Sequence, residues 1–164
     1  MKIFVYGGQK SGKTSCAVRY ALKFSGKKKP IYLATYDNSY GDKNMQKRIN
    51  RHIKERKKSF KSIEKTTKLH KCIKTNETYL IDCMSMWLLN HIELPQKKIL
   101  KQLNKLLDTK ANTVFVLNDI SCGVIPADKI SRKFVDMSGL IGQVLAQKCD
   151  EVVRVEYGIE TKIK

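Results

Sequence analysis

The residues best suited to chemistry form one glycine-rich segment near the start of the chain, Gly7–Thr14 (GGQKSGKT). This segment matches the pattern G-x-x-x-x-G-K-[ST], the P-loop that binds phosphate. Its glycines let the backbone curl so that N–H groups face phosphate oxygens, and the helix that follows adds its positive end. Lys13 is expected to reach the β- and γ-phosphates, and the Thr14 hydroxyl to bind Mg²⁺. The segment predicts a nucleoside triphosphate site; a glycine turn that only caps a helix is the alternative.

Two carboxylates follow apolar runs further along the chain. Asp82 ends the run Thr78–Asp82, and in P-loop proteins a carboxylate at such a place holds Mg²⁺ directly or through water. The alternative is that Asp82 caps the next helix. Asn118-Asp119 ends another apolar run, and open α/β sheets bind ligands at the carboxyl ends of their strands. We therefore expect Thr14 and Asp82 to form a metal site and Asn118-Asp119 to lie on the same side of the sheet.

One histidine has a distinctive setting. Arg48, His52 and Arg56 are spaced by four residues, so on a helix they share one face. Guanidinium groups on either side favour the neutral imidazole, which is the nucleophilic form. From the residues alone a solvated surface histidine is the commoner interpretation, and a nucleophile is the alternative. His70 and His91 have no such setting and are assigned no role.

Strand and helix patterns alternate along the chain, which predicts a mainly parallel sheet covered on both faces. The expected strands are Lys2–Tyr6, Ile31–Thr35, Thr78–Asp82, Thr113–Asn118 and two short strands within Glu151–Lys164 that turn at Tyr157-Gly158; the expected helices are Ser11–Phe24, Asp42–Lys57, a stretch around Trp87–Leu89, Gln96–Leu107 and Asp128–Lys148. On the last helix the residues expected to face inward are Ile130, Phe134, Ile141, Val144 and Leu145. The whole chain, 1–164, is predicted to be one α/β domain with a P-loop NTPase-like, three-layer fold and a C-terminal strand pair.

The composition narrows the class of protein. With 164 residues, 41% of them hydrophobic and 29% charged, the chain suits one globular domain with its own core. No apolar run approaches the ~20 residues of a membrane span, and Ile3–Tyr6 is too short for the core of a signal peptide. The five cysteines are widely spread without a Cys-x-x-Cys pair, which favours reduced thiols in a cytoplasm over a zinc finger or a disulfide framework.

The charge is strongly positive: 33 Lys and Arg against 15 Asp and Glu give +18. Between Lys43 and Lys74 stand 13 basic residues and two acidic ones. Such a patch attracts a nucleoside triphosphate or a nucleic acid. Because Lys far outnumbers Arg and aromatic residues are scarce there, a solvated basic face is favoured over a nucleic-acid groove.

Several motifs occur together and in order. They are the P-loop, Tyr32–Thr35, Arg48-Ile49-x-x-His52-x-x-x-Arg56, Leu80–Cys83 with Trp87-Leu88-x-Asn90, Asn118-Asp119-x-x-x-Gly123-Val124-Ile125-Pro126, Arg132-x-Phe134-x-Asp136-x-x-Gly139, Gln143-x-Leu145-Ala146 and the ending Gly158–Lys164. Through them the chain resembles, nearly end to end, the bifunctional adenosylcobinamide kinase / adenosylcobinamide-phosphate guanylyltransferase family of cobalamin biosynthesis. The P-loop is generic, whereas the blocks around His52 and Gly123–Pro126 are particular to that family.

The resemblance implies two reactions at one nucleotide site. ATP or GTP phosphorylates the aminopropanol hydroxyl of adenosylcobinamide; GTP then loses pyrophosphate to a histidine, and the GMP–histidine intermediate passes GMP to the cobinamide phosphate. On this chain the resemblance makes His52 the nucleophile, with Lys13 as the second catalytic residue and Mg²⁺ on Thr14 and Asp82, and it implies a homotrimer. The nucleotide contacts it implies are Gly8, Gln9, Lys10, Ser11, Gly12, Lys13, Thr14, Ser15, Ala34, Thr35, Tyr36, Ile53, Lys54, Glu55, Arg56, Glu64 and Asp82.

The chain departs from the family pattern at a few positions. Asp119 stands where Glu is usual, Ser121 where Gly is usual, Val135 where Arg is usual and Gly142 where Asn is usual. These departures do not change the residues expected to bind the nucleotide. Any effect they have is expected on cobinamide binding or on one of the two activities. Two other functions stay open: a small P-loop phosphotransferase or NTPase without a covalent intermediate, and a basic nucleic-acid-binding protein.

Overall fold

The computed structural model of the protein describes residues 1–37, 58–120 and 123–164. Within these ranges the chain forms one seven-stranded sheet in the order β3-β2-β4-β5-β1-β6-β7. All neighbouring strands are parallel except β6 and β7, which form the antiparallel C-terminal pair. The strands are β1 (Lys2–Gly7), β2 (Ile31–Ala34), β3 (Lys61–Glu64), β4 (Thr78–Asp82), β5 (Asn112–Asn118), β6 (Glu151–Glu156) and β7 (Ile159–Lys162). The predicted mainly parallel α/β fold is confirmed.

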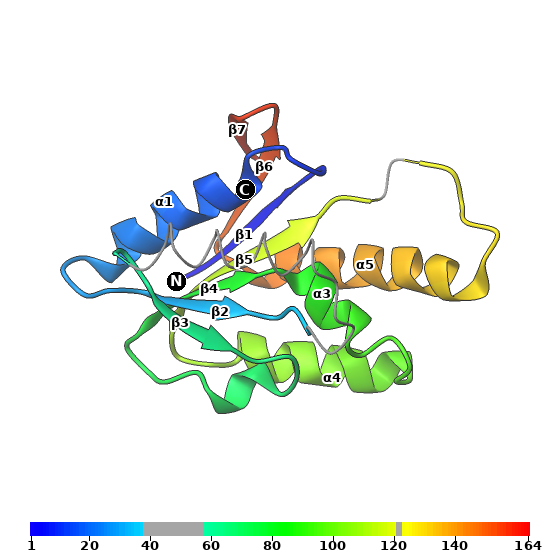
Figure 1. Ribbon diagram of the computed structural model, residues 1–164, viewed down its shortest axis with the longest axis horizontal. Helices are drawn as coiled ribbons and strands as arrows, with labels where there is room; N and C mark the ends of the chain where they lie inside the picture. The colour runs from blue at the N-terminus through cyan, green and yellow to red at the C-terminus, as the bar shows by residue number, and fades with distance from the viewer. Residues whose placement is uncertain (38–57, 121–122) are drawn as a thin grey trace.

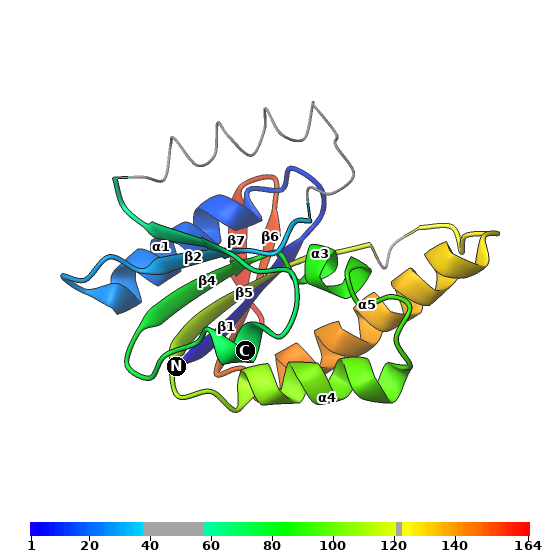
Figure 2. The same cartoon turned by 60° about the horizontal axis from the view of Figure 1, so that its bottom comes forward.

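Helices cover both faces of the sheet, as Figures 1 and 2 show. One face is covered by α1 (Lys13–Ser25), and the other by α3 (Met84–Leu89), α4 (Gln96–Leu107) and α5 (Lys129–Lys148). A short 3₁₀ turn, Leu69–Lys71, lies beside α4. The three-layer arrangement follows from parallel strands, because each crossover places its helix on a sheet face.

The five inner strands, β2, β4, β5, β1 and β6, contribute to two separate cores because their side chains alternate between the faces. Ile3 and Val5 of β1 are fully buried under α1, together with Cys16 and Ala17 of that helix. Phe4, the residue between them, belongs to the larger core under α3, α4 and α5. β1, which lies between β5 and β6 in the sheet, is therefore packed on both of its faces.

Two expectations about the elements were wrong or incomplete. β3 was not predicted, because its four residues are polar apart from the half-buried Ile63 and it lies at an edge of the sheet, where little apolar surface is needed. Ile130 was expected to face inward, but its side chain is 59% exposed. Figure 1 shows the reason: the first turns of α5 project beyond the sheet, so their apolar face has no strand to pack on. The predicted helix Asp42–Lys57 lies outside the described residues.

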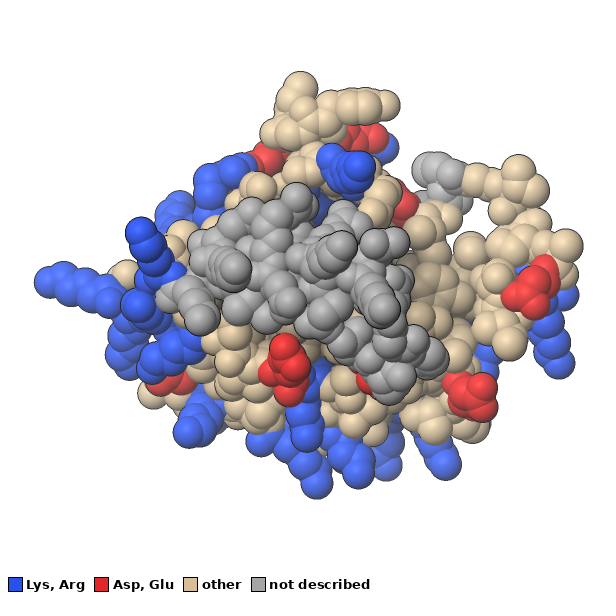
Figure 3. Space-filling view, in the orientation of Figure 1, with Lys and Arg blue, Asp and Glu red and all other residues tan. Residues whose placement is uncertain are grey.

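The basic charge is spread over several elements. On the face shown in Figure 3, Lys and Arg side chains gather over the turn between α1 and β2 and along the edge formed by α4. Such a distribution is expected of a solvated basic surface. In the described part of the chain, no helix combines the length and apolar character that crossing a bilayer requires.

The cysteines of the described ranges, Cys16, Cys72, Cys83 and Cys149, are free thiols. Burial raises the pKa of Cys16 to about 11 and that of Cys149 to about 12. Both therefore stay protonated at neutral pH and act as small apolar core residues.

Candidate nucleotide and acceptor site

The P-loop has the curled backbone that the sequence predicted. Lys10 and Gly12 adopt positive φ angles of 57° and 96°, and α1 begins directly afterwards at Lys13. The Lys13 side chain is buried and its Nζ donates to the carbonyl oxygen of Gly8, 2.9 Å away. No side chain of the described residues caps the start of α1. The first N–H groups of this helix, together with Lys13, therefore form a positive end suited to an anion.

Two close approaches hold the P-loop against the C-terminal strand pair. A Cβ atom on Gly7 would lie 2.2 Å from the carbonyl oxygen of Val155, so only glycine fits there. On the other side of the loop, the Gly158 N–H donates to the Ser11 carbonyl oxygen at 2.8 Å, and a Cβ on Gly12 would lie 3.2 Å from Gly158 Cα. The loop is therefore fixed at both of its motif glycines by chain about 150 residues away.

The predicted metal ligands meet in the structure. The Thr14 hydroxyl donates to Asp82 Oδ2 at 3.3 Å, and the Tyr32 hydroxyl donates to the same oxygen at 2.5 Å. The described residues contain no cluster of three or more His, Cys, Asp or Glu side chains that would hold a metal by itself. One hydroxyl and one carboxylate fit Mg²⁺, which is commonly bound through one or two carboxylates, substrate phosphates and water.

The remaining described nucleotide candidates lie along the same edge of the sheet. Ala34, at the end of β2, pairs with Asp82 of β4 on one side and with Glu64 of β3 on the other. Thr35 is buried; its hydroxyl donates to the Cys83 carbonyl oxygen at 2.7 Å and accepts from the Cys83 N–H at 3.1 Å. Tyr36 is half-buried, and Glu64 is exposed. Of the P-loop candidates, Gln9, Lys10 and Ser15 are exposed, whereas Ser11 is buried.

Cys83 follows Asp82 directly in the sequence. Burial and the negative charge of Asp82 raise the pKa of Cys83 to about 11. The thiol therefore stays neutral at pH 7 and is a poor metal ligand or nucleophile.

The other predicted site residues are not described. His52, Ile53, Lys54, Glu55 and Arg56 all lie outside the described residues, and their predicted roles stay predictions.

Sequence reasoning missed two contributors to this site. Tyr32 was read only as part of a strand motif, although a tyrosine in a buried strand signals a hydroxyl in need of a partner. The turn at Tyr157-Gly158 was predicted, but nothing local indicated that Gly158 packs on the P-loop.

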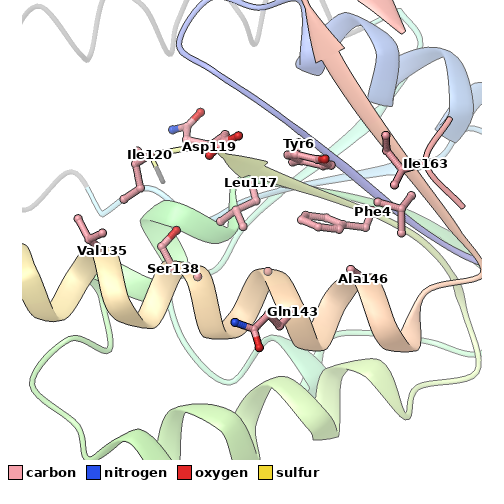
Figure 4. Close-up of a pocket in the computed structure, with 14 residues that line it drawn as sticks. Phe4, Tyr6, Leu117, Asp119, Ile120, Val135, Ser138, Gln143, Ala146 and Ile163 are labelled. Carbon is pink, nitrogen blue, oxygen red and sulfur yellow. The ribbon is translucent and has the colours of Figure 1, made fainter. Parts of the chain in front are cut away.

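A cavity of about 340 Å³ lies on the opposite face of the sheet, between β1, β5, β6 and α5 (Figure 4). Phe4 and Tyr6 form part of its sheet wall, and Gly139 and Gly142 part of its helix wall. At the edge of the sheet it is lined by Asn118 and Asp119. The prediction that Asn118-Asp119 lies on the same side of the sheet as Asp82 is confirmed, because β5 pairs in parallel with β4. The structure adds a direct contact with the P-loop: Asn118 pairs with Gly7, and the Asp119 N–H donates to the Gly7 carbonyl oxygen at 2.8 Å.

Comparison with known proteins agrees with the motifs. The chain is 27% identical, over its whole length and 98% of the other protein, to the bifunctional adenosylcobalamin biosynthesis protein CobP of Pseudomonas aeruginosa. It is 28% identical to the bifunctional adenosylcobalamin biosynthesis protein CobU of Escherichia coli over the whole of both chains. Among solved structures, the flagellar accessory protein FlaH of Methanocaldococcus jannaschii aligns with 99% of this chain and 77% of its own at a TM-score of 0.53 and 13% identity, which shows a shared fold.

The family model for cobinamide kinase / cobinamide phosphate guanyltransferase matches residues 3–163. Both activities in that description are group transfers, so the protein is a transferase. Because the match spans almost the entire chain, this protein belongs to the cobinamide kinase / cobinamide phosphate guanyltransferase family.

Proposed function

We propose that this protein phosphorylates adenosylcobinamide and then transfers GMP from GTP to the resulting phosphate, giving adenosylcobinamide-GDP. The observation that carries the proposal is the contact of Thr14 with Asp82 beside an intact P-loop, in a chain that matches the family over residues 3–163. The P-loop provides a site for a triphosphate, and membership of the family indicates that cobinamide is the phosphate acceptor.

The P-loop suits the phosphate chemistry of both reactions. Each transfer moves negative charge onto the leaving oxygens, which fixed N–H groups and Lys13 stabilise. Lys13 Nζ donates to the Gly8 carbonyl oxygen, so the ammonium group lies inside the loop that would bind the phosphates. The Ser11 hydroxyl is buried without a hydrogen-bond partner among the described residues, and a phosphate oxygen in the loop is a suitable acceptor for it.

Thr14 and Asp82 would hold Mg²⁺. The chemistry that Mg²⁺ would supply there is neutralisation of negative charge on the phosphates. Tyr32 donates to Asp82 Oδ2 and so orients the carboxylate towards Thr14. Such a partner limits the rotation of a ligating carboxylate.

A covalent route for the GMP transfer requires a nucleophile from the protein, and His52 is the proposed one. A ring nitrogen of neutral His52 attacks the α-phosphorus of GTP; the P–N bond forms as the bond to the β-phosphate oxygen breaks, and pyrophosphate leaves. A phosphate oxygen of the cobinamide phosphate then attacks the same phosphorus, and the P–N bond breaks. The support is the Arg48-x-x-x-His52-x-x-x-Arg56 spacing and the guanyltransferase named in the family description.

The covalent step can be tested directly. Wild-type protein incubated with α-labelled GTP and Mg²⁺ is expected to retain label that is lost in acid and stable in base. His52→Ala is expected to retain none, whereas His70→Ala, a matched control at a half-buried histidine of the described residues, labels like the wild type. ATP hydrolysis without label in a folded wild-type protein would contradict the proposal and favour a phosphotransferase without a covalent intermediate.

The same proposal includes a cytoplasmic homotrimer that uses ATP or GTP in the kinase step. Light scattering is expected to give three times the mass of the chain.

The nucleic-acid-binding alternative has its own test. Tight, steeply salt-dependent binding to oligonucleotides would support it.

A further inference from the structure

The cavity between α5 and the sheet is a built pocket with two unlike walls. The sheet wall carries the stacked rings of Phe4 and Tyr6, whose centroids are 5.3 Å apart, with Leu117 beside them. Figure 4 shows these side chains facing α5 across the cavity. A volume of about 340 Å³ is at the lower end of the range for small-molecule sites.

The helix wall is hollow because two of its residues have no side chain. Gly139 and Gly142 line the cavity in the interior of a 20-residue helix, where each glycine is unfavourable relative to alanine. A Cβ on Gly142 would lie 3.5 Å from Leu117, and a Cβ on Gly139 would have nothing within 4 Å. Neither glycine is required by a clash or a positive φ, so their effect is to leave space.

The cavity and the P-loop share one strand and one edge of the sheet. Tyr6 lines the cavity and is followed at once by Gly7, the first residue of the P-loop. The Asp119 N–H, at the end of the cavity, donates to the Gly7 carbonyl oxygen. The P-loop runs into α1 on the opposite face, so a molecule in the cavity approaches the bound phosphates from the α5 side.

These features match what a phosphate acceptor needs. Cobinamide is a corrin ring edged with methyl groups and carboxamide side chains, and it carries the hydroxyl that accepts phosphate. Methyl groups suit the aromatic and aliphatic wall, and carboxamides suit the polar groups of Asn118, Ser138 and Gln143. Resting on the proposed function, we propose that this cavity binds an edge of the corrin ring and that Gly142 determines how much of the ring enters.

The test fills the cavity from the helix side. Gly142→Phe places a ring in the space, and Gly139→Leu fills it from a position where no atom opposes the new side chain. Gln147→Phe is the matched control, because this exposed residue of α5 does not line the cavity. Equilibrium dialysis measures cobinamide binding through the absorbance of the corrin, without any need for turnover, and labelling by α-labelled GTP measures the nucleotide site.

At least tenfold weaker cobinamide binding is expected in the two cavity variants, with wild-type binding in Gln147→Phe and unchanged labelling by GTP in all three. If Gly142→Phe fails to fold, Gly139→Leu decides. Unchanged cobinamide binding in a folded cavity variant would overturn the inference, as would loss of labelling in place of cobinamide binding, because the cavity would then hold the nucleotide. Wild-type protein that binds cobinamide but never transfers a phosphate or GMP to it would refute the proposed function while leaving the cavity assignment intact.

Discussion

On the α1 side of β1 the chain is packed to backbone contact, whereas on the α5 side the same strand borders a cavity of about 340 Å³. Glycines occur on both sides for opposite reasons. Gly7 is required because Val155 leaves no room for a Cβ, and Gly142 leaves room that a Cβ would occupy at ordinary contact distance.

This contrast corresponds to two kinds of ligand. A triphosphate has the same shape in every nucleotide, so a rigid loop held by close contacts is an advantage, since fixed dipoles need not reorganise during the reaction. An acceptor with a bulky, apolar edge needs volume instead. In the proposed assignment, phosphate recognition and acceptor recognition therefore lie on the two faces of one strand.

The largest expected effect is at the phosphate side. Lys13→Ala removes the buried ammonium of the P-loop, and we expect kcat for both transfers to fall about 10²- to 10³-fold, by analogy with the loss of one transition-state donor. Steady-state assays with cobinamide and labelled GTP measure it. Lys23→Ala, at an exposed position in the last turn of α1, is the matched control for lost charge. A Lys13→Ala enzyme within tenfold of the wild type would show that the loop does not serve the reaction.

The packing contrast itself is tested by adding one methyl group. Gly7→Ala is expected to lower the free energy of unfolding by about 1–3 kcal/mol, because backbone must move away from the new Cβ. Gly8→Ala is the neighbouring control: nothing lies within 4 Å of its Cβ, and a change within about 0.5 kcal/mol is expected. Urea denaturation measures both. Equal effects at the two positions would contradict the close approach at Gly7.

Adding one methyl group on the α5 face should change the free energy of unfolding in the opposite direction. Gly142→Ala is expected to raise the free energy of unfolding by about 0.5–1 kcal/mol, because alanine favours the helix and its Cβ meets Leu117 at 3.5 Å. Chemical denaturation again provides the measurement. A loss of stability would mean that the α5 face is packed as tightly as the α1 face.

The smallest effect concerns the start of α5. The N–H of Ser131 donates to Asp128 Oδ2 at 2.7 Å, and this hydrogen bond lowers the pKa of Asp128 below its ordinary value. A carboxylate whose pKa is lowered by folding stabilises the protein above its unfolded pKa, and this contribution disappears as the pH falls through the folded pKa. Asp128→Ala should therefore lower Tm slightly at pH 7, and this difference should shrink as the pH falls through the folded pKa of Asp128. Asp128→Asn keeps a cap that does not titrate, so its Tm difference from Asp128→Ala should persist over the same pH range.

Much of the fold was predictable because its signals are local. The strand Thr78–Asp82 and the helix Gln96–Leu107 were predicted with the bounds that the structure has, since periodic apolar residues and short apolar runs depend only on the neighbouring chain. β3 escaped prediction because its pairing with β2 stabilises a segment with little strand character of its own. The exposure of Ile130 escaped because a helical pattern does not reveal where the sheet beneath it ends.

The residues Gly7–Thr14 specify a phosphate loop on their own, because the motif prescribes backbone conformations and side-chain types within eight consecutive positions. The spacing of Thr14 and Asp82 along the chain, 68 residues, carries no such information, and only the parallel pairing of strands brings their oxygens to 3.3 Å. The cavity depends still more on tertiary structure. Its volume is the space left between a helix that lacks side chains at Gly139 and Gly142 and the sheet that faces it, and only the packing of the two elements brings these walls together.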